Sequence, residues 1–162
     1  MSLQSEGRPA AMHRTYKIKE YVRWSDVDIS GVICWSAYTR FVEAAETELF
    51  RAIGLPYATV YDDLAIWLPR VQLHFDFRKP ALLDEQLEIG VWVGRIRRSS
   101  IRLEFLMRKP GGEVAAEAHM VIVAMDRKTL RATGVPEKLL SVLAPYRADM
   151  AAGGAGSMAV AE

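Results

Sequence analysis

Several features that mark a secreted, membrane or metal-binding protein are scarce in this 162-residue sequence. Cys34 is the one cysteine, so an internal disulfide framework cannot form, which favours a reducing compartment. No stretch approaches the roughly 20 apolar residues needed to span a bilayer. Residues 1–15 contain no apolar core of a signal peptide. We therefore expect a cytoplasmic protein with no membrane partner.

The charges nearly cancel, with 21 basic and 20 acidic residues. A nucleic-acid partner is not expected, because it would demand a clustered excess of Lys and Arg. The three histidines lack the spacing of a metal-ligand set, so no metal site is expected. No glycine-rich loop precedes a helix in the pattern that cradles phosphates, which argues against nucleotide hydrolysis.

The overall composition is that of one soluble domain, since 51% of the residues are hydrophobic and 25% are charged. Residues 1–14 show no periodicity and are expected to form a disordered leader. Residues 148–162 are rich in Ala and Gly and are expected to form a flexible tail. The domain itself is expected over residues 15–147, which is long enough to bury a core.

One long helix is expected over residues 36–53. Ser36 is positioned to cap its start, and Gly54 followed by Pro56 ends it. The apolar residues of this segment fall on a single helical stripe: Tyr38, Phe41, Val42, Ala45, Leu49, Ala52 and Ile53.

Most of the remaining domain follows a period of two, which indicates half-buried strands. In the clearest case, Val71, Leu73, Phe75 and Phe77 alternate with polar residues. Strands are expected over residues 16–23, 71–78, 87–94, 101–108 and 114–125, with a hairpin turn at 110–112 and a short helix or turn over 136–143. The strand over 114–125 is the most apolar and is therefore expected to be central.

This order of elements predicts an α+β protein. Sequential strands joined by short turns are expected to pair antiparallel, and one apolar face of their sheet must be covered. The helix over residues 36–53 is the one large apolar helix available for this. The economical fold is a curved, five-stranded antiparallel sheet wrapped around that helix.

The segment just before the helix, residues 22–33, has the sequence Val-Arg-Trp-Ser-Asp-Val-Asp-Ile-Ser-Gly-Val-Ile. An aromatic residue followed by Asp-x-Asp-x-x-Gly resembles the opening motif of the hot-dog-fold thioesterases of the 4-hydroxybenzoyl-CoA thioesterase type. The resemblance implies the hot-dog fold and extends over residues 16–143. Further matching positions are Tyr38, Phe41, Glu43, Phe77–Pro80, Asp84–Glu85 and Arg97–Ser100.

The resemblance implies that Asp28, the second aspartate of the motif, is the catalytic carboxylate. It would either attack the thioester carbonyl, giving an anhydride, or activate a water molecule. A place beside a helix N-terminus suits this chemistry, because first-turn amides are unpaired and carry partial positive charge. By motif position, the backbone amide of Trp35 would polarise the carbonyl, and Gly31 would let the backbone approach the substrate closely.

Three neighbouring positions have competing interpretations. Asp26 is expected to be structural, bonding to local backbone and shaping the loop, because aspartate is common in turns. Cys34 is either a thiol nucleophile near the helix N-terminus or a small buried core residue. His74 and His119 are expected either to line a pocket or subunit interface, or to be ordinary satisfied polar residues.

Residues 94–102 contain four arginines. This window is either a solvated hairpin end or a place where Arg97, Arg98 and Ser99, together with Lys79, engage the phosphates of coenzyme A. Family members bind the nucleotide near this turn. Coenzyme A would be part of the substrate, and no separate cofactor is expected.

Trp24, Trp35, Tyr38 and Trp67 are candidates for an acyl pocket, although aromatic residues are core residues by default. Trp35 and Tyr38 gain support because they adjoin the motif. Many relatives carry His or an aromatic residue after the motif Gly and Asn in the first helical turn, whereas this chain has Val32 and Ala37 in that neighbourhood. We therefore expect a more apolar pocket than in those relatives.

The sequence therefore predicts a hydrolase of acyl-CoA or acyl carrier protein thioesters. A homodimer joined edge to edge through its sheets is expected, or a homotetramer, because a lone sheet leaves an exposed edge. One alternative is a non-catalytic acyl-CoA-binding module with the same fold. A dehydratase of this fold is disfavoured, because such enzymes use a His that the motif lacks.

Overall fold

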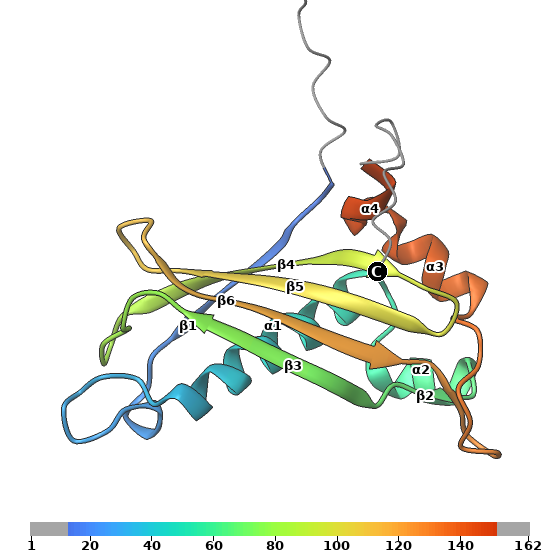
Figure 1. Ribbon diagram of the computed structural model, residues 1–162, viewed down its shortest axis with the longest axis horizontal. Coiled ribbons are helices and arrows are strands. Elements are labelled where there is room, and N and C mark those ends of the chain that lie inside the picture. The colour runs from blue at the N-terminus through green and yellow to red at the C-terminus, as the bar shows by residue number, and fades with distance from the viewer. Residues whose placement is uncertain (1–12, 152–162) are drawn as a thin grey trace, which may run out of the picture.

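A computed structural model describes residues 13–151 of the chain. Segments 1–12 and 152–162, where a leader and most of a tail are expected, lie outside the described residues. A five-stranded antiparallel sheet packs on one long helix, α1 (Tyr38–Ala52), which runs behind the sheet in Figure 1. This α+β architecture is the predicted one.

The strand order within the sheet is β1-β4-β5-β6-β3. The β4–β5 and β5–β6 hairpins are confirmed, and β6 lies inside the sheet as its apolar sequence predicts. The expectation that the strand over 71–78 pairs with the next strand is wrong. Since β4 is paired on both sides by β1 and β5, β3 instead joins the free edge of β6. The strands are β1 (Tyr16–Tyr21), β3 (Arg70–Phe77), β4 (Gln86–Ile96), β5 (Ser100–Arg108) and β6 (Val114–Val123).

The core lies between α1 and the sheet face that it covers. Phe41, Ala45 and Leu49 on the helix stripe are fully buried, as are Val91 on β4 and Leu103 on β5. Removing these side chains from water is the main favourable term in folding. The periodicities of 3.6 and 2 seen in the sequence therefore identify the two faces of this core.

The start of the helix differs from the prediction. Residues Trp35–Ala37 form a 3-10 turn, η2, and α1 begins after it at Tyr38. Ser36 does not cap the helix through its side chain; instead its carbonyl accepts a hydrogen bond from the Thr39 hydroxyl at 2.7 Å. The reason is that η2 leads directly into α1, so the extended residue before the helical segment is Cys34 and not Ser36.

Smaller elements complete the domain. The short C-terminal helix is confirmed as α3 (Glu137–Leu143), and a turn of helix, α4 (Ala148–Ala151), lies where the flexible tail is expected to begin. Asp149 of α4 accepts the Ile96 amide at 3.2 Å and thereby holds this segment on β4. Two elements were not predicted from the sequence: helix α2 (Tyr57–Asp63) and the two-stranded sheet of β2 (Ile66–Trp67) and β7 (Met125–Asp126). The elements η1 (Trp24–Asp26) and η3 (Ala144–Tyr146) are single 3-10 turns.

The edge strand β3 is more exposed than its alternating pattern predicts. Val71, Leu73 and Phe77 are 61%, 43% and 51% exposed, and Phe75 is partly buried. The helix lies mainly against β1 and β4 at the other side of the sheet, so it covers little of this edge. The expectation of a half-buried strand over 71–78 is therefore not met within a single subunit.

Over the described residues 13–151, no helix is both long and apolar enough to cross a membrane. In the same range, no group of three or more His, Cys, Asp and Glu side chains is placed to hold a metal ion.

Candidate active site

The motif before α1 forms a tight hairpin. Val27 and Ile33 pair across it, and the Asp28 amide donates to the Val32 carbonyl at 3.0 Å. The Gly31 amide donates to the Asp28 carbonyl at 3.0 Å, which closes a four-residue turn. Gly31 has a φ of +75°, a conformation that favours glycine, so this position is fixed by backbone geometry.

The hairpin is bonded to the segment between β3 and β4. The Ile33 amide donates a hydrogen bond to the Ala81 carbonyl at 3.0 Å, and the Leu83 amide donates one to the Gly31 carbonyl at 3.1 Å. Val32 and Leu82 form a further bridge. This cross-link positions the motif beside the helix entry, although the two segments are about fifty residues apart in the sequence.

The Asp28 carboxylate lies at the tip of this hairpin and is exposed. One oxygen accepts the Ser30 amide at 2.8 Å and also the Ser30 hydroxyl. These two hydrogen bonds from Ser30 lower the pKa of Asp28, because they stabilise the charged form. Asp28 is therefore an ionised, solvent-accessible carboxylate at neutral pH.

Replacing Ser30 by Ala is expected to raise the pKa of Asp28 towards the ordinary value for aspartate. The hydroxyl is the largest cause of the lowered pKa, and its removal weakens the preference for the charged form. The acidic limb of the pH profile of any activity that depends on ionised Asp28 would then shift to higher pH. A ¹³C NMR titration of the Asp28 carboxyl carbon measures this directly.

Ser25→Ala is the matched control, because Ser25 is an exposed residue of the same motif and makes no bond to Asp28 among the described residues. An Asp28 titration that is identical in the Ser30→Ala variant and the native protein would contradict this account.

A cavity of about 250 Å³ lies beside the hairpin. Trp35, whose side chain is 74% exposed, begins the turn η2, so its amide has no acceptor within that turn. Among the described residues this amide makes no hydrogen bond. Tyr38 is buried against Phe77, with ring centroids 5.2 Å apart, and burial raises the pKa of its hydroxyl. The cavity is lined by Val32, Ile33, Trp35, Tyr38, Phe77, Arg78, Lys79 and Pro80.

The predicted site residues therefore divide into two groups. Gly31, Trp35, Tyr38 and Lys79 lie at one end of the sheet together with Asp28, although Asp28 itself does not line the cavity. The turn over residues 97–99 lies at the opposite end, because β4 leads away from the motif towards it (Figure 1).

The separation of the two groups is large. With a rise of about 3.3 Å per residue, β4 carries the chain roughly 30 Å from Gln86 to Ile96. Arg97, Arg98 and Ser99 are thus not brought to Asp28 within one subunit.

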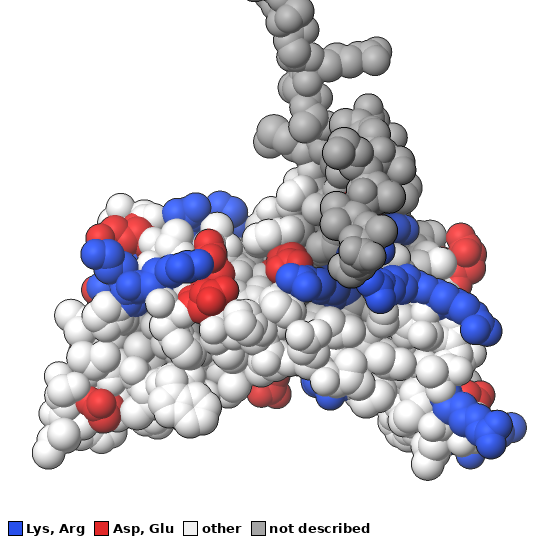
Figure 2. Space-filling view, in the orientation of Figure 1, with Lys and Arg blue, Asp and Glu red and all other residues white. Residues whose placement is uncertain are grey.

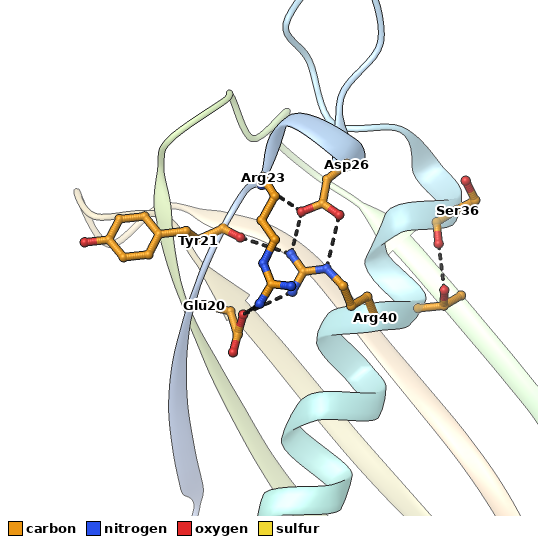
Figure 3. A network of polar contacts seen from close by, with 7 residues as sticks. Glu20, Tyr21, Arg23, Asp26, Ser36 and Arg40 are labelled. Carbon is orange, nitrogen blue, oxygen red and sulfur yellow. Dashed lines mark hydrogen bonds and ion pairs between the residues drawn. The ribbon is translucent and has the colours of Figure 1, made fainter.

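Asp26 is structural, as predicted, but its main partner was missed. Asp26 is only 3% exposed. Its carboxylate accepts a hydrogen bond from the Arg23 amide at 2.8 Å and two more from the Arg40 side chain on α1, one of them from Nε at 3.1 Å (Figure 3). Arg40 also bonds Glu20 and the carbonyl of Tyr21 on β1. Burial acts to raise the pKa of Asp26, but the bonds from Arg40 and Arg23 outweigh it and lower the pKa. The sequence offers no signal for this pairing, because residues 26 and 40 meet only once the helix packs.

We expect Arg40→Met to destabilise the fold by about 3 kcal/mol, because it leaves the buried Asp26 carboxylate without its cation. Without Arg40, burial dominates and the pKa of Asp26 rises, so the stability difference from the native protein should narrow as the pH falls. Urea unfolding at several pH values measures both effects.

Arg51→Met, which removes a 58% exposed arginine paired with Glu48, is the control and should cost about 0–1 kcal/mol. Equal losses for the two variants would count against a central role of the Asp26–Arg40 pair.

The remaining candidates lie elsewhere or contribute packing. Trp24 is 81% exposed, and Trp67 packs against Tyr61, so neither lines the cavity beside the motif. Cys34 is half-buried, and its amide donates to Asp26 at 2.8 Å. The pair His74 and His119 stacks across β3 and β6, with ring centroids 5.0 Å apart, and lines a separate cavity of about 270 Å³.

In addition to these two cavities, the structure has a groove of about 280 Å³ that was not predicted from the sequence. It lies between α1 and β3 and contains the buried Glu46, which is 1% exposed. The Glu46 carboxylate accepts hydrogen bonds from Arg70 Nη2 at 2.9 Å and from the Tyr57 hydroxyl. Burial is the largest influence on Glu46 and raises its pKa, while its two bonds act in the opposite direction. Arg70 thus links the start of β3 to the middle of α1.

An antiparallel sheet packed on one helix, with an Asp-x-Asp-x-x-Gly hairpin at the helix entry, defines a hot-dog protein of the thioesterase class. The family model of the thioesterase-like superfamily matches residues 22–143, and the chain belongs to this family.

Curated relatives are similar over most of their length. A 4-hydroxybenzoyl-CoA thioesterase of Pseudomonas sp. is 29% identical over 133 residues, covering 77% of this chain and 94% of that one. The 1,4-dihydroxy-2-naphthoyl-CoA hydrolase of Synechococcus elongatus is 22% identical over 125 residues, covering 76% and 91%. The acyl-CoA thioester hydrolase YbgC of Escherichia coli is 22% identical over 120 residues, covering 74% and 89%.

Solved structures share the fold at lower identity. A Staphylococcus aureus protein in complex with CoA superposes with a TM-score of 0.77 and 14% identity, covering 96% of this chain and 94% of that one. A mutant 4-hydroxybenzoyl-CoA thioesterase complexed with 4-hydroxybenzoyl-CoA has a TM-score of 0.72 and 24% identity, covering 80% and 99%.

Proposed function

We propose that this protein hydrolyses acyl-CoA thioesters with Asp28 as its nucleophile or general base. The observation that carries the proposal is an ionised, accessible carboxylate in a hydrogen-bonded hairpin at the helix entry. In this region the Trp35 amide has no hydrogen-bond partner among the described residues, and an apolar cavity lies beside the hairpin. The curated relatives support the reaction class, because those named above are hydrolases of CoA thioesters.

Two routes use these groups. Asp28 attacks the carbonyl carbon, the thiolate leaves and takes up a proton, and water then hydrolyses the resulting anhydride. Alternatively, Asp28 accepts a proton from the water molecule that attacks the carbonyl. In both, the Trp35 amide stabilises the oxyanion that develops on the carbonyl oxygen. The products are a carboxylic acid and a free thiol.

The apolar and the basic residues of the site would contact different parts of the substrate. Trp35 and Tyr38 provide apolar walls for the acyl part of the substrate, and Lys79 at the cavity rim faces its phosphates. Arg97, Arg98 and Ser99 would contribute phosphate contacts from the β4–β5 turn. One relative of known structure is described as a complex with CoA.

The separation of Asp28 from this turn favours a site shared between two subunits. An edge-to-edge homodimer through β3 would continue the sheet and cover the exposed side chains of Val71, Leu73 and Phe77. Two-fold symmetry makes the paired strands antiparallel, so the Asp28 end of one subunit approaches the arginine end of the other. A tetramer would arise if two such dimers associate.

A panel of acyl-CoA thioesters of different chain length and aromaticity, followed by chromogenic detection of the released thiol, tests the proposal. Release of CoA from at least one thioester, well above the uncatalysed rate, is the expected result.

The rival candidate is a non-catalytic acyl-CoA-binding module. It is favoured by one observation, that the Asp28 carboxylate bonds within its own turn and does not line the cavity. Binding of acyl-CoA in calorimetry without thiol release from any member of the panel would favour this module and end the hydrolase proposal.

A further inference from the structure

The cavity beside the motif and the groove that contains Glu46 lie along the same two elements, α1 and β3. Because α1 lies mainly against β1 and β4, it leaves space on its β3 side. At the motif end, the ring of Tyr38 packs against that of Phe77. Further along, Leu73 lines the groove, and at the start of β3 Arg70 bonds Glu46. The two spaces therefore follow one another from the motif towards Glu46, and we call them the α1–β3 path.

Most walls of the α1–β3 path are apolar. Val42 of α1 and Met120 of β6 line it beside Leu73, and the side chains of Leu73 and Phe77 are 43% and 51% exposed. Figure 2 shows few charged side chains along the lower edge of the sheet face, where β3 runs. Cavities of about 250 and 280 Å³ in succession, with such walls, suit a long apolar chain.

The far end of the path is polar. Glu46 is 1% exposed, and its two carboxylate oxygens accept hydrogen bonds from the Tyr57 hydroxyl and from Arg70 Nη2. Burying an ion pair costs desolvation that an apolar pair would avoid. Buried ionisable groups with perturbed pKa values in a cleft are candidates for functional groups, and burial raises the pKa of Glu46. This cluster is therefore a candidate for substrate recognition.

Two charged groups at this end remain available to a ligand. The Arg70 side chain is 41% exposed and makes one hydrogen bond among the described residues, to Glu46, which leaves its Nε and Nη1 donors free. Glu43, one turn before Glu46 on α1, is exposed and lines the same groove. A hydroxyl group can accept a hydrogen bond from Arg70 and donate one to Glu43. A carboxylate would instead meet the like charge of Glu43.

The distance to the reacting carbonyl sets the length of the chain. At about 1.5 Å per residue, the helix carries the backbone roughly 15 Å from Trp35, whose amide would bind the carbonyl oxygen, to Glu46. With C–C bonds of about 1.5 Å at near-tetrahedral angles, an extended chain advances about 1.25 Å per carbon, so about 12 carbons span this length. A hydroxyl on a single aromatic ring lies too near the carbonyl to reach Glu46.

We propose that the acyl group is an aliphatic chain of about 12 carbons with a hydroxyl at its far end, which Arg70 and Glu43 bind. Glu46, held by the Tyr57 hydroxyl, is the positioning residue that orients Arg70. This inference rests on the hydrolase function proposed above and names the acyl class of its substrate. An unsubstituted chain binds less well, because it leaves desolvated polar groups without partners.

The test uses two non-hydrolysable thioethers of coenzyme A, one with a dodecyl chain and one with an ω-hydroxydodecyl chain, compared by isothermal titration calorimetry. The native protein is expected to bind the hydroxylated thioether roughly tenfold more tightly or better, the effect of a hydrogen bond to a charged group. The corresponding thioesters should show the same preference in kcat/KM. With hexyl chains, which are too short to reach the cluster, the preference should disappear.

The double variant Glu46→Met/Arg70→Met removes the polar end without leaving a buried charge unpaired, a replacement that is often neutral for stability. Its affinity ratio should fall to about one. Glu43→Leu, at an exposed position, tests the same site without disturbing the buried pair and should lower the ratio about threefold or more. Glu48→Met/Arg51→Met removes an exposed ion pair from the same helix and should leave the ratio unchanged.

Equal affinity of the native protein for the two dodecyl thioethers would overturn the inference. An undiminished ratio in either folded variant would do the same, and so would a hydroxyl preference as large for hexyl chains as for dodecyl chains. Failure of the hydrolase proposal looks different: neither thioester is cleaved, while the calorimetric preference for the hydroxylated chain persists.

Discussion

Replacing Asp28 by Asn is expected to lower kcat by roughly 10²–10⁴-fold, the usual contribution of a positioned base. The side chain keeps its shape, and its oxygen still accepts the bonds from Ser30 that hold the turn. What disappears is the negative charge, and with it both the nucleophile and the proton acceptor. Thiol release under saturating acyl-CoA measures kcat, and calorimetry checks that the thioester still binds.

Asp63→Asn, which neutralises an exposed carboxylate on α2, is the matched control and should retain native activity. Thermal unfolding of both variants shows whether the fold is preserved. A variant at Asp28 that releases thiol at the native rate would refute the assigned role, because no step of either route proceeds without the carboxylate.

Leu73→Lys on the edge strand β3 is expected to convert the protein to a monomer and to lower kcat/KM by roughly 10²-fold or more, since misplaced binding groups alone can cost this much. Lysine places a charge on an edge that the proposed partner strand must cover. Sedimentation equilibrium measures the oligomeric state, and the thiol-release assay measures kcat/KM. Tyr21→Lys is the control, because Tyr21 is 56% exposed on β1, the opposite edge of the sheet.

Mixing two inactive or weakened variants tests whether one active site uses residues of both subunits. This test does not depend on any local damage that the Leu73 substitution causes. In a heterodimer of Asp28→Asn with Arg97→Gln/Arg98→Gln, one site combines a native Asp28 with a native turn from the other subunit. Exchange of subunits should therefore restore the native KM in a fraction of the sites. If KM stays at the value of the arginine variant after mixing, Asp28 and the turn act within the same subunit, and the shared-site proposal fails.

The candidate site shows which properties of a loop a sequence can report. A loop shaped by Asp26 was predicted because aspartate is common in turns, and within this loop Gly31 adopts the positive φ of a tight turn. The structural role of Asp26 was also predicted, and its burial bears this out, whereas the catalytic role of Asp28 stays a prediction. Arg40 was missed, because its relation to Asp26 depends on the rotation of α1 against the hairpin.

The elements of this protein follow from local periodicity. The helix stripe and the alternating strands each bury one face, and that requirement acts within every segment separately, so the residues of α1 and of the main strands could be named in advance. The arrangement of these elements in the sheet could not be predicted from local periodicity. The place of β3 beside β6 depends on which sheet edge is free after β4 has taken β1 and β5 as neighbours, and the bond from Arg70 to Glu46 exists only because that pairing sets the start of β3 within reach of α1.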